Sequence, residues 1–256
     1  MSFTVIIPAR YASIRLPGKI LKDIEGKTLL HRVFLCVKES NAESIIVATD
    51  EQRIVDEAKK IGVDVCLTDE SHQSGTERIS EVVTKLKIPA DTIIVNVQGD
   101  EPFMPAACIE QVANLLIKNK QADMATLYTP LLETDEIADS NVVKVVVNNN
   151  NEAMYFSRAP IPWFRDEYEK QFYSATHLHN TFRHIGIYAY RAGFVQSLIE
   201  YPACRLEQIE KLEQLRALWN GHVIQTAQAV EVPGPGIDSE SDLNTARERV
   251  KNEKSS

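Results

Sequence analysis

Cysteine is scarce in this sequence, and a long apolar segment is missing. The four cysteines stand at positions 36, 66, 108 and 204, a spacing that suits neither a disulfide framework nor a zinc site. No apolar run approaches the roughly 18 residues of a membrane span, and the N-terminus lacks the charged, apolar and small-residue order of a signal peptide. We therefore expect a cytoplasmic protein without a membrane partner.

Positive charge is also in short supply. The 256 residues carry 28 Lys and Arg against 36 Asp and Glu, which gives a formal net charge of −8. A protein that binds the nucleic-acid backbone needs a basic field, so we expect no nucleic-acid partner. Residues 1–22 are the exception, because they hold Arg10, Arg15, Lys19 and Lys22 and no acidic residue.

Common phosphate-binding and nucleophile motifs are missing as well. Gly26-Lys27-Thr28 ends like a P-loop, but Leu21 stands where that motif needs its first glycine. No G-x-G-x-x-G follows the first predicted strand, and no G-x-S-x-G occurs, which disfavours a dinucleotide fold and a serine nucleophile. For the group His177, His179 and His184, surface or substrate contacts are favoured over a metal site.

Short β-branched runs alternate with helical periods through the first 120 residues. Strands are predicted at 3–7, 45–48, 63–67 and 93–97, and helices over 29–37, 54–61, 76–87 and 105–119. This order is typical of βαβ units, which build a parallel sheet with helices on both faces. Ligands of such sheets bind at the carboxyl ends of the strands.

The second half of the chain is less regular. Strands are predicted at 124–128, 142–147, 153–156 and 183–190, with a turn at 148–151 that indicates a hairpin. Residues 206–218 show a strong helical period, and Ser239 with Asp242 three residues on indicates the N-cap of a last helix. Residues 165–180 are polar and aromatic without a period, so we expect a loop or lid there.

Two segments follow predicted strands and carry groups suited to phosphate and metal. The loop at 8–19 presents Arg10, Arg15 and Lys19, which could wrap a polyphosphate, although a solvated basic loop is equally consistent with the composition. Asp100 follows the strand at 93–97 and could hold Mg²⁺, which prefers oxygen ligands. From local chemistry alone, an Asp-initiated turn is the simpler interpretation.

Two further segments lie at predicted helix starts. Ser74 and Thr76 could present hydroxyls and backbone amides to a ligand, or could simply cap the helix that follows. Asp238 follows the rigid turn at 233–236, where it could be a second metal ligand or an acid that favours the helix dipole.

Seven segments, taken in order, resemble the motifs of one family, the cytidylyltransferases that activate 3-deoxy-D-manno-octulosonate (Kdo), or CMP-Kdo synthetases. They include IIPARYASIRLPGK at 6–19, HQSGTER at 72–78 and VNVQGDEP at 95–102. The other four lie at 155–163, 183–191, 206–216 and 232–238. The resemblance covers nearly the whole chain. Small departures at Ile14, Ile20 and Pro160 remove no residue to which we assign chemistry.

The resemblance implies a fold and a reaction. The implied fold is α/β, with a mixed, mostly parallel central sheet flanked by helices, of nucleotide-diphospho-sugar transferase type. It would form a single domain over 1–250, with a smaller β-rich lid, dimerisation or sugar-binding subregion at about 130–190 and a polar tail at 251–256. The implied reaction is the Mg²⁺-dependent transfer of CMP from CTP to the anomeric hydroxyl of Kdo, with release of pyrophosphate, for lipopolysaccharide assembly by a homodimer.

The resemblance also implies residue roles. Arg10, Lys19, Asp100 and Asp238 are the implied catalytic residues, and the last two would converge on Mg²⁺. The implied nucleotide contacts are Pro8, Ala9, Arg10, Arg15, Lys19, Gln73, Ser74, Gly75, Arg78, Gln98 and Asp100. The implied contacts of the sugar acid are Arg158, His184, Tyr188, Glu210, Glu213 and Gln214. Glu210 and Glu213 are three residues apart, which predicts that they share one helix face, where a merely solvated pair would be the default interpretation.

Three alternatives stay open at this point. The sugar acid could be an 8-amino analogue of Kdo or a sialic acid, and residues 155–215 would decide the choice. The chain could also be a non-catalytic nucleotide-binding paralogue, although Arg10, Lys19, Asp100 and Asp238 are all present. A glycosyltransferase of similar fold would typically show an Asp-x-Asp motif, whereas Gln98-Gly99-Asp100 offers a single acid.

Overall fold

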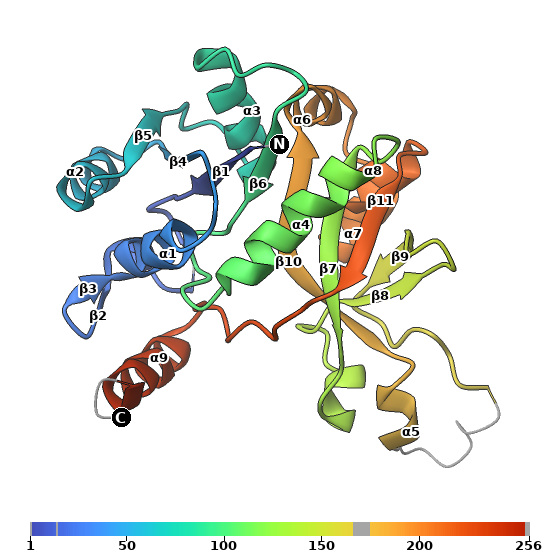
Figure 1. Ribbon diagram of the computed structural model, residues 1–256. Helices are drawn as coiled ribbons and strands as arrows, with labels where there is room; N and C mark the ends of the chain where they lie inside the picture. Colours follow the sequence, from blue (N-terminus) through green and yellow to red (C-terminus); the bar gives the residue numbers. More distant parts are fainter. Residues whose placement is uncertain (1, 14, 166–174, 254–256) are drawn as a thin grey trace.

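The centre of the computed structural model, which describes residues 2–13, 15–165 and 175–253, is a mixed sheet of nine strands (Figure 1). The strand order is β11-β7-β10-β6-β1-β4-β5, and β8 pairs with both β10 and β9. The strands are β1 (Phe3–Pro8), β4 (Ser44–Thr49), β5 (Asp64–Leu67), β6 (Ile93–Asn96), β7 (Met124–Pro130), β8 (Lys144–Val147), β9 (Ala153–Ser157), β10 (Phe182–Arg191) and β11 (Ile224–Gln228). A separate ribbon joins β2 (Asp23–Ile24) to β3 (Lys27–Thr28).

Parallel pairing dominates the half of the sheet that the first 100 residues build. β1 is parallel to both β4 and β6, and β4 is parallel to β5. β11 is parallel to β7, whereas the long β10 runs antiparallel to β6 and β7. The predicted mixed, mostly parallel α/β sheet is therefore confirmed. Because β1 and β6 are parallel neighbours, the loops that follow them leave the sheet at the same edge.

Helices cover both faces of the sheet (Figure 1). The α-helices are α1 (Leu29–Lys38), α2 (Gln52–Ile61), α3 (Gly75–Lys85), α4 (Ala106–Lys118), α5 (Ala175–Leu178), α6 (Ala192–Glu200), α7 (Arg205–Glu210), α8 (Leu215–Trp219) and α9 (Glu240–Glu253). Two 3₁₀ turns are η1 (Lys19–Leu21) and η2 (Thr134–Ile137). Within the described residues, none of the helices combines the length and the apolar character that crossing a bilayer requires.

Two apolar layers sandwich the sheet, and β1 shows how the sequence divides between them. Val5 and Ile7 pack in the layer that includes α1, α2, α4 and α9, whereas Ile6 packs in the layer that includes α3, α6 and α8. All three side chains are fully buried. Side chains alternate between the faces of a strand, so an unbroken apolar run is what a strand covered on both faces requires.

The predicted helix over 206–218 is wrong in one respect, because the chain breaks it in two. α7 ends at Glu210, the next residue Lys211 adopts the left-handed backbone conformation with φ of 56°, and α8 starts only at Leu215. Nothing in the sequence marks this break, since left-handed helix ends are usually glycine. As a consequence, Glu210 and Glu213 do not share a helix face, and each contacts a different part of the protein.

The predicted hairpin and the predicted start of the last helix are both confirmed. β8 and β9 pair antiparallel around the turn at 148–151. Ser239 and Asp242 cap α9 reciprocally, each accepting a hydrogen bond from the backbone amide of the other. α9 continues through Glu253, so the expected tail at 251–256 begins inside this helix, and residues 254–256 lie outside the described residues.

The β-rich subregion at 130–190 contains the hairpin β8–β9, the turn η2 and the short helix α5, and it shares β10 with the central sheet. Part of the loop expected at 165–180 lies outside the described residues, and its last part forms α5. Whether this subregion acts as a lid or in dimerisation stays a prediction.

A buried lysine secures the base of this hairpin. The side chain of Lys144 is completely inaccessible to solvent, and its ammonium donates hydrogen bonds to the carbonyls of Asp139, Val142 and Arg158 at 2.6–2.8 Å. Desolvation lowers the pKa of this amine below its usual range. The three carbonyls supply the partners that a buried ammonium needs, and they tie two loops to the first residue of β8.

Candidate functional site

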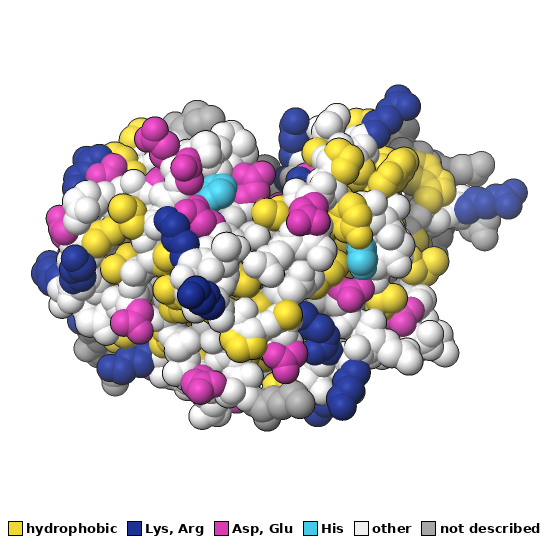
Figure 2. All heavy atoms as spheres, turned by 90° about the horizontal axis from the view of Figure 1, so that it is seen from above, with side chains coloured by type: hydrophobic (Ala, Val, Ile, Leu, Met, Phe, Trp, Pro, Cys, Tyr) yellow, Lys and Arg dark blue, Asp and Glu magenta, His cyan; other side chains and the backbone are white. Residues whose placement is uncertain are grey.

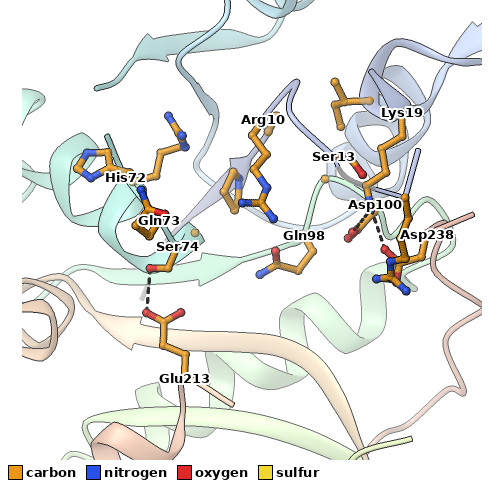
Figure 3. Close-up of a pocket in the computed structure, with 17 residues that line it drawn as sticks. Arg10, Ser13, Lys19, His72, Gln73, Ser74, Gln98, Asp100, Glu213 and Asp238 are labelled. Carbon is orange, nitrogen blue, oxygen red and sulfur yellow. Dashed lines mark hydrogen bonds and ion pairs between the residues drawn. The ribbon is translucent and has the colours of Figure 1, made fainter. Parts of the chain in front are cut away.

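A polar cavity of about 600 Å³ lies where β1 and β6 end (Figure 3). All the residues predicted to contact the nucleotide line it, namely Pro8, Ala9, Arg10, Arg15, Lys19, Gln73, Ser74, Gly75, Arg78, Gln98 and Asp100. Asp238 and Glu213 line it too. Five segments far apart in the sequence therefore meet around one cavity, and their contact with a nucleotide stays a prediction.

Lys19 joins the two aspartates that were predicted to converge. Its ammonium lies 2.7 Å from Asp100 Oδ2 and 2.9 Å from Asp238 Oδ1, and it donates a third hydrogen bond to the carbonyl of Ile237 at 3.0 Å (Figure 3). Arg15 contacts the other oxygen of Asp238 at 2.9 Å. Burial alone would lower the pKa of the Lys19 amine, but the Asp100 and Asp238 carboxylates outweigh burial and raise it. The amine is therefore charged at neutral pH.

The turn before η1 aims Lys19 at this point. Gly18 has a φ of 66°, and a Cβ atom there would lie 2.9 Å from the ring of Tyr11, so both conformation and space require glycine. The amide of Gly18 donates to the carbonyl of Tyr11, and the amide of Lys19 donates to the carbonyl of Leu16. The guanidinium of Arg53 covers the other side of this loop by stacking over the Tyr11 ring, 3.7 Å from its centroid.

Close backbone approach brings the Asp100 loop against the end of β1. A Cβ atom on Gly99 would lie 2.9 Å from the carbonyl oxygen of Pro8, so a larger residue would push the two loops apart. The carbonyl of Asp100 in turn accepts a hydrogen bond from the amide of Ile237 at 2.9 Å. This bond fixes the C-terminal turn that carries Asp238 beside the loop that carries Asp100.

Arg10 and Gln98 lie between the Lys19 group and the pair Ser74–Glu213 (Figure 3). The Arg10 side chain is exposed, and among the described residues its guanidinium contacts no carboxylate. The amide nitrogen of Gln98 donates to Asn96 Oδ1 at 3.1 Å, which leaves its second N–H and the side-chain carbonyl available to a ligand. The cavity thus offers a cationic centre flanked by hydrogen-bonding groups.

Ser74 has the capping role considered for it, and its contact with a ligand stays a prediction. Its hydroxyl accepts a hydrogen bond from the amide of Glu77, which caps α3, and donates one to Glu213 Oε1 at 3.0 Å. Burial raises the pKa of the Glu213 carboxyl. Arg78 lines the cavity, but its guanidinium is held by Asp50 at 2.8 Å and by the hydroxyl of Thr68. The two terminal guanidinium nitrogens of Arg78 are therefore already engaged within the protein.

A smaller cavity of about 130 Å³ adjoins the first. Gly75, Gln98 and Glu213 line both cavities, while Tyr188 and Gln214 line only the smaller one. The side-chain nitrogen of Gln214 is buried and has no hydrogen-bond partner among the described residues. Three of the six predicted sugar contacts, Tyr188, Glu213 and Gln214, are therefore gathered here beside the main cavity.

The other three predicted sugar contacts lie in neither cavity. Glu210 accepts hydrogen bonds from the Ser157 hydroxyl at 2.6 Å and from the amide of Arg158, and the Arg158 guanidinium donates to the carbonyls of Glu210 and Ser140. His184 contacts the hydroxyl of Thr126 at 2.9 Å. The structure thus engages all three within the protein, and their contact with a sugar stays a prediction.

Sequence reasoning did not single out several neighbours of the site. Ser13, Ile20, His72 and Gly99 line the main cavity, and all of them fall inside or next to the motifs already quoted. Glu101 is adjacent to Asp100, and burial followed by the Asp100 charge raises the pKa of its carboxyl to about 7. Glu101 is partly buried because it packs against the turn at 233–238. Local sequence patterns do not predict such long-range packing.

The residues present fit a divalent cation held by few protein ligands. Asp100 and Asp238 already direct their oxygens at one positive group. No set of three or more His, Cys, Asp or Glu suited to a metal occurs within the described parts of the chain. Mg²⁺ commonly takes one or two carboxylates and completes its shell with water and phosphate oxygens, so a two-carboxylate site suits it.

Charge on the outer surface is mixed. The view from above shows Lys and Arg interspersed with Asp and Glu over the drawn face, and a hollow between a larger and a smaller lobe (Figure 2). Arg10, Arg15 and Lys19, by contrast, all line one cavity.

The fold and the cavity together define a nucleotidyltransferase, and comparison with known proteins narrows the class. The family model described as cytidylyltransferase matches residues 4–226. A 3-deoxy-manno-octulosonate cytidylyltransferase of Photobacterium profundum is 51% identical over 248 residues, which cover 96% of this chain and 98% of that one. That of Tolumonas auensis is 49% identical over 255 residues, covering 100% and 99%. The chain belongs to the 3-deoxy-manno-octulosonate cytidylyltransferase family.

Solved structures agree with this assignment. CMP:2-keto-3-deoxy-manno-octonic acid synthetase complexed with CTP superposes with a TM-score of 0.88 at 36% identity, covering 99% of this chain and 100% of that one. A 4-diphosphocytidyl-2C-methyl-D-erythritol synthase of Anaerococcus prevotii gives a TM-score of 0.60 at 14% identity, covering 98% and 96%. The second likeness shows a shared fold only.

His184 generates a prediction for the pH dependence of stability. Burial, and then the charge of Arg183, lowers the pKa of its imidazole from 6.5 to about 3. The unfolded chain therefore binds the proton more readily, and protonation favours unfolding. The contribution of His184 is fully present above about pH 6.5 and is lost toward pH 3, by about 1.4 kcal/mol per pH unit.

Urea denaturation at about pH 7.5 and about pH 5 measures this effect. The free energy of unfolding should fall less between the two pH values in His184→Gln than in the wild type. His179→Gln, at an exposed histidine, should keep the wild-type difference. An unchanged pH difference in His184→Gln would contradict the prediction.

Proposed function

We propose that the protein transfers CMP from CTP to the anomeric hydroxyl of Kdo and releases pyrophosphate, with Mg²⁺, as a cytoplasmic step of lipopolysaccharide assembly. The observation that carries this proposal is the cavity of about 600 Å³, whose lining includes every residue predicted for the nucleotide. Relatives that are 49–51% identical in sequence and align over 96–100% of this chain are named 3-deoxy-manno-octulosonate cytidylyltransferase.

The protein's own groups address the main obstacle, which is the repulsion between an anionic sugar acid and an anionic triphosphate. In the proposed reaction the anomeric oxygen bonds to the α-phosphorus, the bond between that phosphorus and the bridging oxygen breaks, and the hydroxyl proton is released. Arg10, Arg15 and Lys19 would neutralise the triphosphate and orient it for in-line attack. Charge stabilisation and positioning supply most of the rate in such transfers, so no side-chain nucleophile is required.

Asp100 and Asp238 would hold the Mg²⁺ ion. When bound, the ion supplies charge neutralisation at the α-phosphate and makes the attacking hydroxyl more acidic. The smaller cavity, with Tyr188, Glu213 and Gln214, is the proposed position of the sugar acid, because it adjoins the main cavity and holds buried polar groups. Its volume of about 130 Å³ accommodates only part of such a ligand, so the sugar would extend into the main cavity.

A pyrophosphate-release assay over a panel of substrates tests the proposal. With Mg²⁺ present, CTP and Kdo should release pyrophosphate, whereas ATP, GTP and UTP should release little. Kdo should turn over faster than its 8-amino analogue or a sialic acid. Faster turnover with either analogue would reassign the acceptor, and no release with any pair would favour the non-catalytic nucleotide-binding alternative.

Asp100→Asn tests the metal role. Replacing one carboxylate oxygen by a neutral amide should lower kcat by about 10²–10⁴-fold, because the metal supplies several kcal/mol of transition-state stabilisation. Circular dichroism should show an unchanged fold. The matched control is Asp64→Asn, at an exposed position of β5, which should leave kcat unaltered. Turnover of Asp100→Asn within about twofold of the wild type would refute the ligand role.

We also propose that the protein is a homodimer. Met154 on β9 and Ile209 on α7 are 61% and 65% exposed, and the bond from Ser157 to Glu210 joins these two elements. Exposed apolar side chains on adjoining elements are typical of a protein interface. Light scattering should give twice the 28.8 kDa chain mass.

Met154→Glu should reduce this mass toward that of one chain, whereas Leu86→Glu, at an exposed leucine after α3, should not. A wild-type mass of 28.8 kDa at micromolar concentration would overturn the dimer.

A further inference from the structure

One ammonium group occupies the position toward which both proposed metal ligands point. Lys19 donates to Asp100, Asp238 and the carbonyl of Ile237, all within 3.0 Å, so three oxygens surround a single positive charge (Figure 3). A cluster of carboxylate and carbonyl oxygens is also the kind of donor set that a small divalent cation takes. Lysine and metal would therefore use the same oxygens.

The electrical balance of the cluster opposes metal entry. Asp100 and Asp238 contribute two negative charges, and Lys19 and Arg15 contribute two positive ones, so the cluster is neutral as it stands. A divalent cation gains little by approaching a neutral cluster, and it must also displace a hydrogen-bonded ammonium. The Lys19 side chain is 14% exposed, whereas that of Arg15 is 65% exposed. Lys19 is therefore the cation that lies at the position where a metal would contact both carboxylates.

We propose that Lys19 is the positioning residue of this aspartate pair and that it exchanges with the divalent metal, so that the metal enters only when a triphosphate offers Lys19 another anionic partner. The inference rests on the proposed function, because it takes Asp100 and Asp238 as metal ligands and a triphosphate as the incoming anion. Before exchange, Lys19 holds together two carboxylates that would otherwise repel each other. After exchange, the Lys19 ammonium would form ion pairs with the phosphates.

The reach of Lys19 suits this dual use. Its side chain starts at the first residue of η1, directly after the turn at Gly18, and that turn is part of the loop that also carries Arg10 and Arg15. Both arginines line the same cavity as Asp100. A small rotation of a lysine side chain, without backbone movement, is enough to carry the ammonium from carboxylates at one end of the cavity toward a ligand within it.

Metal binding without nucleotide tests the exchange directly. Mn²⁺ titrated into the full-length protein and followed by electron paramagnetic resonance should bind weakly to the wild type. Lys19→Met, which keeps an unbranched side chain one atom shorter and removes the charge, should bind Mn²⁺ at least about tenfold more tightly. Lys19→Gln serves as a second variant in case the first fails to fold, and a thermal melt checks both.

The matched control is Lys22→Met. It removes the same charge three residues away, where the ion pair of Lys22 among the described residues is with Glu240, at 3.8 Å, and it should change Mn²⁺ affinity by less than about twofold. The double variant Lys19→Met/Asp100→Asn localises the effect, because it should lose the affinity gained by the single variant.

Three outcomes would overturn the exchange. They are an equal or weaker affinity in both Lys19 variants, an equal gain in Lys22→Met, and a gain that persists in the double variant. The titration contains neither CTP nor a sugar acid. Its failure is therefore distinguishable from a failure of the pyrophosphate-release panel.

Discussion

The attraction between one lysine and two aspartates is the interaction on which the site depends. Asp100 lies 81 residues and Asp238 lies 219 residues beyond Lys19, so the contact joins the beginning, the middle and the end of the chain. It can form because β1 and β6 are parallel neighbours and because the amide of Ile237 binds the carbonyl of Asp100. The sheet therefore sets the position of the charges, and the charges in turn hold the last turn of the chain against the sheet.

The position of the main cavity could be predicted from sequence for a physical reason. The loops that carry Arg10 and Asp100 directly follow strands, and parallel strands deliver such loops to one edge. The motif that contains Arg10 and the motif that contains Asp100 each follow an apolar run that is easy to identify as a strand. Once both strands are assigned, the meeting of the loops follows, and only Arg78 differs, because Asp50 holds its guanidinium.

The sugar part could be predicted less well, because its geometry depends on a break without a sequence signal. Lys211 adopts a conformation that lysine rarely takes, and the apolar period of 206–218 continues through the break as if one helix ran across it. The break sends Glu210 toward Ser157 and Glu213 toward Ser74, on opposite sides of one short segment. Long-range packing decides this conformation, and a local pattern cannot report it. The burial that perturbs Glu101 has the same origin.

Lys144 has a consequence for how the subregion at 130–190 moves. Among the described residues its ammonium is hydrogen-bonded to three carbonyls, so the hairpin β8–β9 cannot separate from its two loops without leaving a buried ammonium short of partners. Moving β8 away from either loop has to break at least one of these hydrogen bonds. The stretch from Asp139 to Arg158 is therefore tied together at a single side chain, and this one contact sets where the hairpin starts and where it ends.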